Sequence, residues 1–77
     1  MPDPAARPKS IDELCVDADY AWADADVLTL REVTDQLAVR APEPLHRHLL
    51  QLSEACVSDP ERALVMWAEL KDRIPRG

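Results

Sequence analysis

The chain has 77 residues and a net charge of −6 at neutral pH, with 47% hydrophobic and 31% charged residues. A chain of this length forms one domain, and this composition excludes a fully disordered polypeptide. Its acidic balance argues against a protein that binds mainly to nucleic-acid phosphates. Strong helix formers dominate, and the single glycine is the last residue. These features predict an all-α fold.

Residues 1–9 contain three of the seven prolines and no periodic apolar pattern, so we expect a flexible leader before a single helical domain over 10–77. No segment resembles a signal peptide or reaches the roughly 20 apolar residues of a membrane span. The two cysteines, Cys15 and Cys56, are too few for a disulfide framework. We therefore expect a cytoplasmic protein with reduced thiols and no membrane association.

Capping residues and apolar spacing predict a small bundle of four short helices, near 10–26, 29–40, 44–56 and 59–74. Ser10–Glu13 and Thr29–Glu32 have the spacing of capping boxes and would open the first two helices. Pro44 can serve as the first residue of the third helix. Because residues 24–28 contain no helix breaker, the first two helices could instead form one bent helix. The short connections predict antiparallel neighbours.

Apolar residues spaced three and four apart predict the core of this bundle. The expected core residues are Leu14, Ala18, Trp22, Leu30, Val33, Leu37, Leu45, Leu49, Leu52, Leu64, Trp67 and Leu70. His48 falls on the inner stripe of the third helix. We expect it to be a core histidine that is hydrogen-bonded to a backbone carbonyl.

The net charge is concentrated in the first predicted helix. Residues 12–26 carry six acids and no lysine or arginine, whereas the remaining nine acids are matched by nine bases. On a helical wheel of this segment, two groups of acidic residues lie on either side of a second apolar stripe, which is opposite the core stripe. Val16 and Tyr20 of that stripe could pack beneath the N-terminal leader, which would leave a solvated acidic face. Alternatively, the face binds a partner through Asp12, Val16, Asp17, Asp19, Tyr20, Ala23, Asp24, Asp26 and Val27.

The sequence contains no motif that predicts metal binding or catalysis. The pairs Asp17/Asp19 and Asp24/Asp26 are two residues apart, so on a helix their side chains diverge by about 200°. The two histidines of residues 46–48 diverge in the same way. There is no internal glycine to build a phosphate-binding loop. We expect no metal ion, no cofactor and no enzymatic activity.

Residues 29–39, TLREVTDQLAV, followed by LHRHL at 45–49, resemble the helix–turn–helix of small bacterial repressors. In that family a scaffold helix ends in a tight turn and a recognition helix follows. Ala38 stands where the family has a turn glycine, and residues 40–44 form a longer connection. The resemblance implies a degenerate helix–turn–helix transcriptional regulator.

The charge pattern favours a different function. We expect a small protein-binding regulatory module, such as an adaptor, an inhibitor or an accessory subunit, that presents its acidic first helix to a basic partner. The helix–turn–helix regulator is the alternative. If the chain forms a homodimer, we expect the third and fourth helices to make the contact, because pairing two acidic first helices would oppose like charges.

Overall fold

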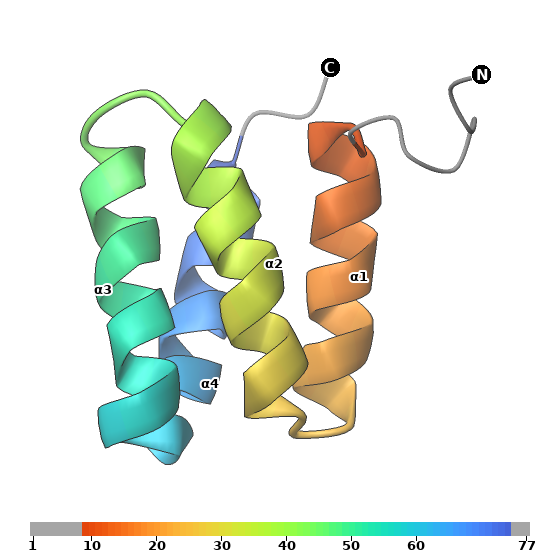
Figure 1. Ribbon diagram of the computed structural model, residues 1–77, viewed down its shortest axis with the longest axis vertical. Helices are drawn as coiled ribbons and strands as arrows, with labels where there is room; N and C mark the ends of the chain where they lie inside the picture. Colours follow the sequence, from red (N-terminus) through yellow and green to blue (C-terminus); the bar gives the residue numbers. More distant parts are fainter. Residues whose placement is uncertain (1–8, 75–77) are drawn as a thin grey trace, which may run out of the picture.

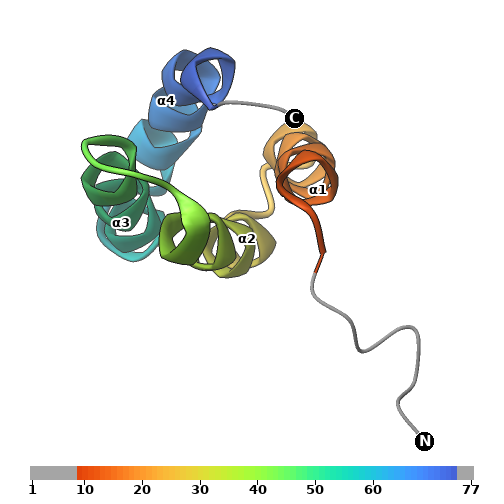
Figure 2. The ribbon, with the colours of Figure 1, turned by 90° about the horizontal axis from the view of Figure 1, so that it is seen from above.

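A computed structural model describes residues 9–74, and within this range the chain is helical with short connections. The helices are α1 (Ile11–Ala23), α2 (Val27–Arg40), α3 (Leu45–Ser58) and α4 (Pro60–Leu70), followed by the 3₁₀ turn η2 (Lys71–Arg73). Each helix runs antiparallel to the next one along the chain (Figure 1). Viewed from above, the four helices surround a common core in chain order (Figure 2). The predicted all-α four-helix bundle is confirmed, whereas most of the predicted leader lies outside the described residues.

The starts of three helices follow from their capping residues. At α1 the capping box is confirmed: the Glu13 amide donates to Ser10 Oγ over 3.2 Å, and the Ser10 amide donates to Glu13 Oε1 over 3.4 Å. The side chain of Asp59 caps α4, and Pro60 occupies its first turn. The predicted capping box at Thr29 is wrong, because α2 begins two residues earlier and Asp26 accepts the Thr29 amide.

The turn between α1 and α2 separates two helices, so the first part of the chain does not form one bent helix. The Asp26 amide donates to the Ala21 carbonyl over 2.8 Å, and the Ala25 amide donates to the Trp22 carbonyl over 3.0 Å. This pair of bonds is the Schellman motif, which needs one residue in the left-handed region. Ala25 supplies it with φ 54°, although it carries a Cβ atom. Two separate helices therefore form, and α1 ends at Ala23 instead of continuing to residue 26.

The core consists of one layer of side chains between the four helices, and ten of the twelve predicted core residues are buried in it. Trp22 and Leu64 are the two errors, because Trp22 is 37% exposed and Leu64 is only partly buried. The prediction also missed small and polar residues that are buried, among them Ala21, Thr34, Ala38, Ser53 and Ala55. Among the described residues, every buried polar side-chain atom has a hydrogen-bond partner. None of the described helices combines the length and apolarity needed to cross a bilayer.

Candidate interaction surfaces

The outward side of α1 carries carboxylates and apolar groups together. At 100° per residue, six exposed residues lie opposite the buried Leu14, Ala18 and Ala21. Tyr20 is 72% exposed and Val16 47% exposed near the middle of this side. We call it the acidic face, and its residues are Asp12, Glu13, Val16, Tyr20, Ala23 and Asp24. Five of them belong to the predicted partner-binding set, and Glu13 joins them through its position on the helix.

Two predicted site residues lie elsewhere, because α1 ends earlier than expected. Val27 is the first residue of α2, where it is partly buried and packs against the core. Asp26 caps α2: its carboxylate accepts the Thr29 amide over 3.3 Å and the Thr29 hydroxyl over 2.7 Å. The hydrogen bonds from Thr29 lower the pKa of Asp26 below its ordinary value. An acid that was assigned to the unfavourable C-terminal end of one helix therefore stabilises the N-terminal end of the next.

Asp17 and Asp19 flank the acidic face and are engaged within the protein. The Lys9 ammonium lies 2.5 Å from Asp17 Oδ2, and the hydrogen bond between them raises the pKa of Lys9. Asp19 Oδ1 accepts the indole N–H of the buried Trp67 over 3.0 Å. The same oxygen lies 3.9 Å from the ammonium of Lys71. These two acids therefore contribute less uncompensated charge than Asp12 and Asp24, which have no basic side chain within 4 Å among residues 9–74.

The contact between α1 and α4, which we call the seam, was not predicted from the sequence. Two tryptophans bridge it in opposite directions: the Trp22 indole N–H donates to the Leu64 carbonyl over 2.8 Å, and Trp67 donates to Asp19. The Lys71 ammonium lies 5.3 Å from the centre of the Trp22 ring, within cation–π distance. Trp22 was predicted to be a core residue, but its indole lies at the edge of the bundle, where it can meet a backbone carbonyl.

Tyr20 is the residue that separates the two explanations for the second apolar stripe. No described residue covers most of its ring, which remains 72% exposed. Lys9, the part of the predicted leader that the structure describes, lies beside Asp12, Val16 and Asp17 in a shallow depression at the start of α1. The rest of the predicted cover falls outside the described residues.

The residue types that could bind metals do not gather in one place. Over residues 9–74, no three His, Cys, Asp or Glu side chains lie where they could hold a metal ion. The histidine that contacts a backbone carbonyl is His46, whose Nδ1 lies 2.5 Å from the Ala38 oxygen. His48 was predicted for that role but instead lines an open groove between α3 and α4. Burial raises the pKa of the Cys56 thiol, which disfavours the reactive thiolate.

The segment with helix–turn–helix resemblance forms an antiparallel pair. Helices α2 and α3 lie side by side in both views (Figures 1 and 2), and Figure 1 shows that they run in opposite directions. In a DNA-binding helix–turn–helix the two helices instead meet at about 90–120°. A role as a helix–turn–helix regulator stays a prediction. Comparisons of the chain with protein families, curated proteins and solved structures give no match.

Proposed function

We propose that this protein is a protein-interaction module whose acidic face binds a basic, partly apolar segment of a partner. The observation that carries the proposal is the exposure of Tyr20, a large aromatic side chain, in the middle of a helix face with carboxylates at both ends. Aromatic residues contribute much of the binding energy at protein interfaces. The proposal assigns the chain a regulatory or accessory role without a catalytic step.

Electrostatics supply the second part of the argument. Asp24 lies at the C-terminal end of α1, where the helix dipole disfavours an anion, and it has no cation within 4 Å among the described residues. Its position adds nothing to the stability of the helix. A cluster of uncompensated carboxylates attracts a basic partner and raises the rate of encounter. Tyr20 and Val16 would then supply the apolar contact after encounter.

A labelled amphipathic peptide that bears lysine, arginine and leucine is a suitable probe, with fluorescence anisotropy as the measurement. The variant Asp12→Asn/Asp24→Asn should bind it roughly threefold to tenfold more weakly, because each exposed ion pair contributes up to about 1 kcal/mol. Tyr20→Ala should weaken binding by at least about tenfold. Binding should also weaken as salt concentration rises.

Matched controls separate the acidic face from the overall negative charge. Glu43→Gln/Glu54→Gln removes the same net charge from the α2–α3 connection and α3, and Val39→Ala removes an apolar side chain that is 83% exposed on α2. Both controls should bind the peptide like the parent protein. Equal losses in the controls and the face variants would show non-specific attraction and contradict the proposal.

A further inference from the structure

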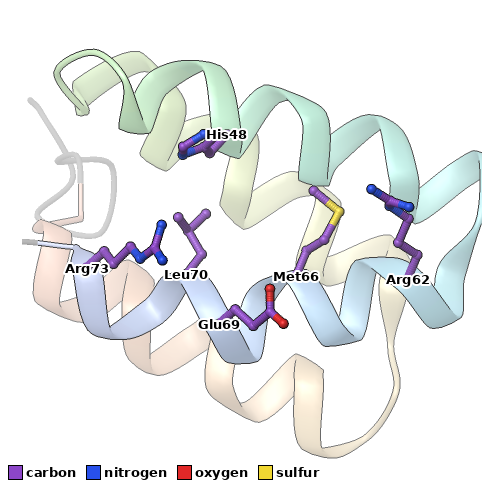
Figure 3. Close-up of a pocket in the computed structure, with 6 residues that line it drawn as sticks. All are labelled: His48, Arg62, Met66, Glu69, Leu70 and Arg73. Atoms are coloured by element: carbon purple, nitrogen blue, oxygen red, sulfur yellow. The ribbon is translucent and has the colours of Figure 1, made fainter.

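The groove between α3 and α4 is the complement of the acidic face. It has a volume of about 230 Å³ and is lined by His48 from α3 and by five residues of α4 and η2. Arg62 and Arg73 stand at its two ends, and Met66 and Leu70 lie between them (Figure 3). Glu69 lies on its α4 side (Figure 3). The groove therefore presents an arginine at each end, with the apolar Met66 and Leu70, the His48 imidazole and the Glu69 carboxylate between them.

The two arginines are uncompensated in a protein of net charge −6. Within residues 9–74, the ion pairs closer than 4 Å are Lys9–Asp17 and Lys71–Asp19, so neither arginine of the groove has a carboxylate partner. Glu69 precedes Arg73 by four residues, but Arg73 belongs to the 3₁₀ turn η2, in which residues three apart share a face, and the two do not form an ion pair. Both guanidinium groups remain available to carboxylates from outside the molecule.

The spacing of charges in the groove matches the spacing on the acidic face. Asp12 and Asp24 are 12 residues apart on α1, which corresponds to about 18 Å at 1.5 Å per residue. Arg62 and Arg73 are 11 residues apart, and eight steps of about 1.5 Å in α4 with three of about 2.0 Å in η2 give about 18 Å. Apolar side chains occupy the middle of both surfaces. Asp12 and Asp24 lie on opposite edges of the face, about 120° apart around α1, so the face must cross the groove obliquely to bring a carboxylate near each arginine and Tyr20 over the middle of the groove.

The two surfaces cannot meet within one molecule. Viewed from above, α1 lies on the side of the bundle away from α3 (Figure 2), and its acidic face points outward from the core. A contact between the face and the groove must therefore join two copies of the chain.

We propose that the α3–α4 groove binds the acidic face of α1 from a second copy of this protein. The inference rests on the proposed function, because it assigns a partner to the same face. It differs from the possible homodimer through the third and fourth helices that the sequence suggested, because only one copy contributes those helices to the contact. This head-to-tail contact avoids placing two acidic helices together and leaves one face and one groove open at the ends of each assembly. A contact confined to one groove of about 230 Å³ is expected to be a weak interface.

Sedimentation velocity on two complementary variants tests this contact. Arg62→Glu/Arg73→Glu reverses the charges of the groove and leaves the acidic face unchanged. Asp12→Lys/Asp24→Lys reverses the charges of the acidic face and leaves the groove unchanged. Each variant alone should self-associate at least about tenfold more weakly than the parent, because like charges on the face and the groove then repel each other. An equimolar mixture should associate again, since the intact face of one variant meets the intact groove of the other, and the reversed charges of the remaining face and groove are also complementary. The parent protein should show a mass that rises with concentration up to about 1 mM, as expected for a weak interface.

Two controls carry charge changes of the same size at other positions. Arg31→Glu/Arg47→Glu and Glu43→Lys/Glu54→Lys should self-associate like the parent. Circular dichroism should show the parent's helix content in every variant. If a charge reversal unfolds the protein, the neutral pair Arg62→Gln/Arg73→Gln replaces it and should also weaken association.

A parent protein that stays monomeric, or a mixture that forms no complex, would overturn the inference. The basic-peptide experiment keeps the proposed function distinct from it. Peptide binding without self-association would retain the acidic face as a docking site for another protein and reject the second copy as its partner. If neither occurs, both proposals are wrong.

Discussion

Ala25 occupies a backbone conformation that suits glycine. For an L-residue the left-handed region costs about 1–2 kcal/mol, and only glycine enters it without this cost. Replacing Ala25 by glycine also makes the unfolded chain more flexible, which opposes stability by about 0.4–1 kcal/mol. We therefore expect Ala25→Gly to stabilise the protein by about 0.5–1 kcal/mol, measured as the free energy of unfolding in urea.

Ala23→Gly is the matched control, since Ala23 is the last residue of α1 and has a helical conformation. It should destabilise the protein by about 0.5–1 kcal/mol. If both substitutions destabilise the protein equally, the turn at Ala25 is not left-handed.

Asp26 shows how a single side chain fixes the start of a helix. Its hydrogen bonds with Thr29 occupy backbone and side-chain donors at the N-terminus of α2. Because these bonds lower the pKa of Asp26 in the folded protein, the stabilisation is complete above its unfolded value of 3.8. It is lost as the pH falls through the lower folded value. The charge of Asp26 therefore serves the fold at neutral pH, which removes it from the surface open to a partner.

At the level of elements, α1 and α4 depend on polar bonds made by large aromatic side chains. The Trp67 indole is fully buried, so its N–H needs the bond to Asp19. A double-mutant cycle of Asp19→Ala and Trp67→Phe should give a coupling energy of about 1–2 kcal/mol, because the first change leaves a buried donor unsatisfied. Thermal and urea unfolding of the four proteins measure it. The same cycle with Asp12→Ala, which removes an acid from the other side of α1, should give no coupling. A similar coupling in both cycles would mean that Asp19 acts through charge alone.

The number of helices and their inner faces could be predicted from the sequence because they depend on local signals. A capping box at Ser10, the prolines before α3 and in the first turn of α4, and apolar spacing of three and four are read from a few neighbouring residues. The turn at Ala25 could not be predicted in this way, because its usual signal is a glycine. Asp26, three residues before Thr29, was the available sign of a new helix.

The seam at Trp22 was unpredictable for another reason. Its spacing from Leu14 and Ala18 is correct for a core residue, but its burial depends on what α4 places opposite it. The Leu64 carbonyl holds the indole at the edge of the bundle, and a carbonyl in a later helix leaves no mark on local spacing. For the acidic face, the helical wheel placed Tyr20 opposite the core stripe but left open whether the leader covers it. Val27 was misplaced because the end of α1 was misplaced. The binding role of that face stays a prediction.

At the scale of the molecule, the acidic face of α1 has acids and no base, whereas α4 and η2 carry three bases, Arg62, Lys71 and Arg73, interspersed with three acids, Glu61, Glu69 and Asp72. The acidic face and the arginines of the α3–α4 groove lie on different sides of the bundle, and neither set forms an ion pair closer than 4 Å within residues 9–74, in which the ion pairs are those of Lys9 and Lys71. Uncompensated charges of opposite sign on different sides of a small domain favour directed association, in which one orientation of the partner is preferred.

A domain of 77 residues is expected to have a free energy of unfolding of about 4–12 kcal/mol, so a single core substitution can unfold a large part of the protein. Leu49 is fully buried in α3, so Leu49→Ala should cost about 2–5 kcal/mol through lost burial and the cavity left behind. Circular dichroism during urea and thermal unfolding should show a lower midpoint or a largely unfolded protein. Leu50→Ala removes the same atoms from the next residue, which is 46% exposed, and should cost less than about 1 kcal/mol. If the two variants unfold alike, Leu49 does not face the core, and the packing of α3 against α2 and α4 must be different from that described.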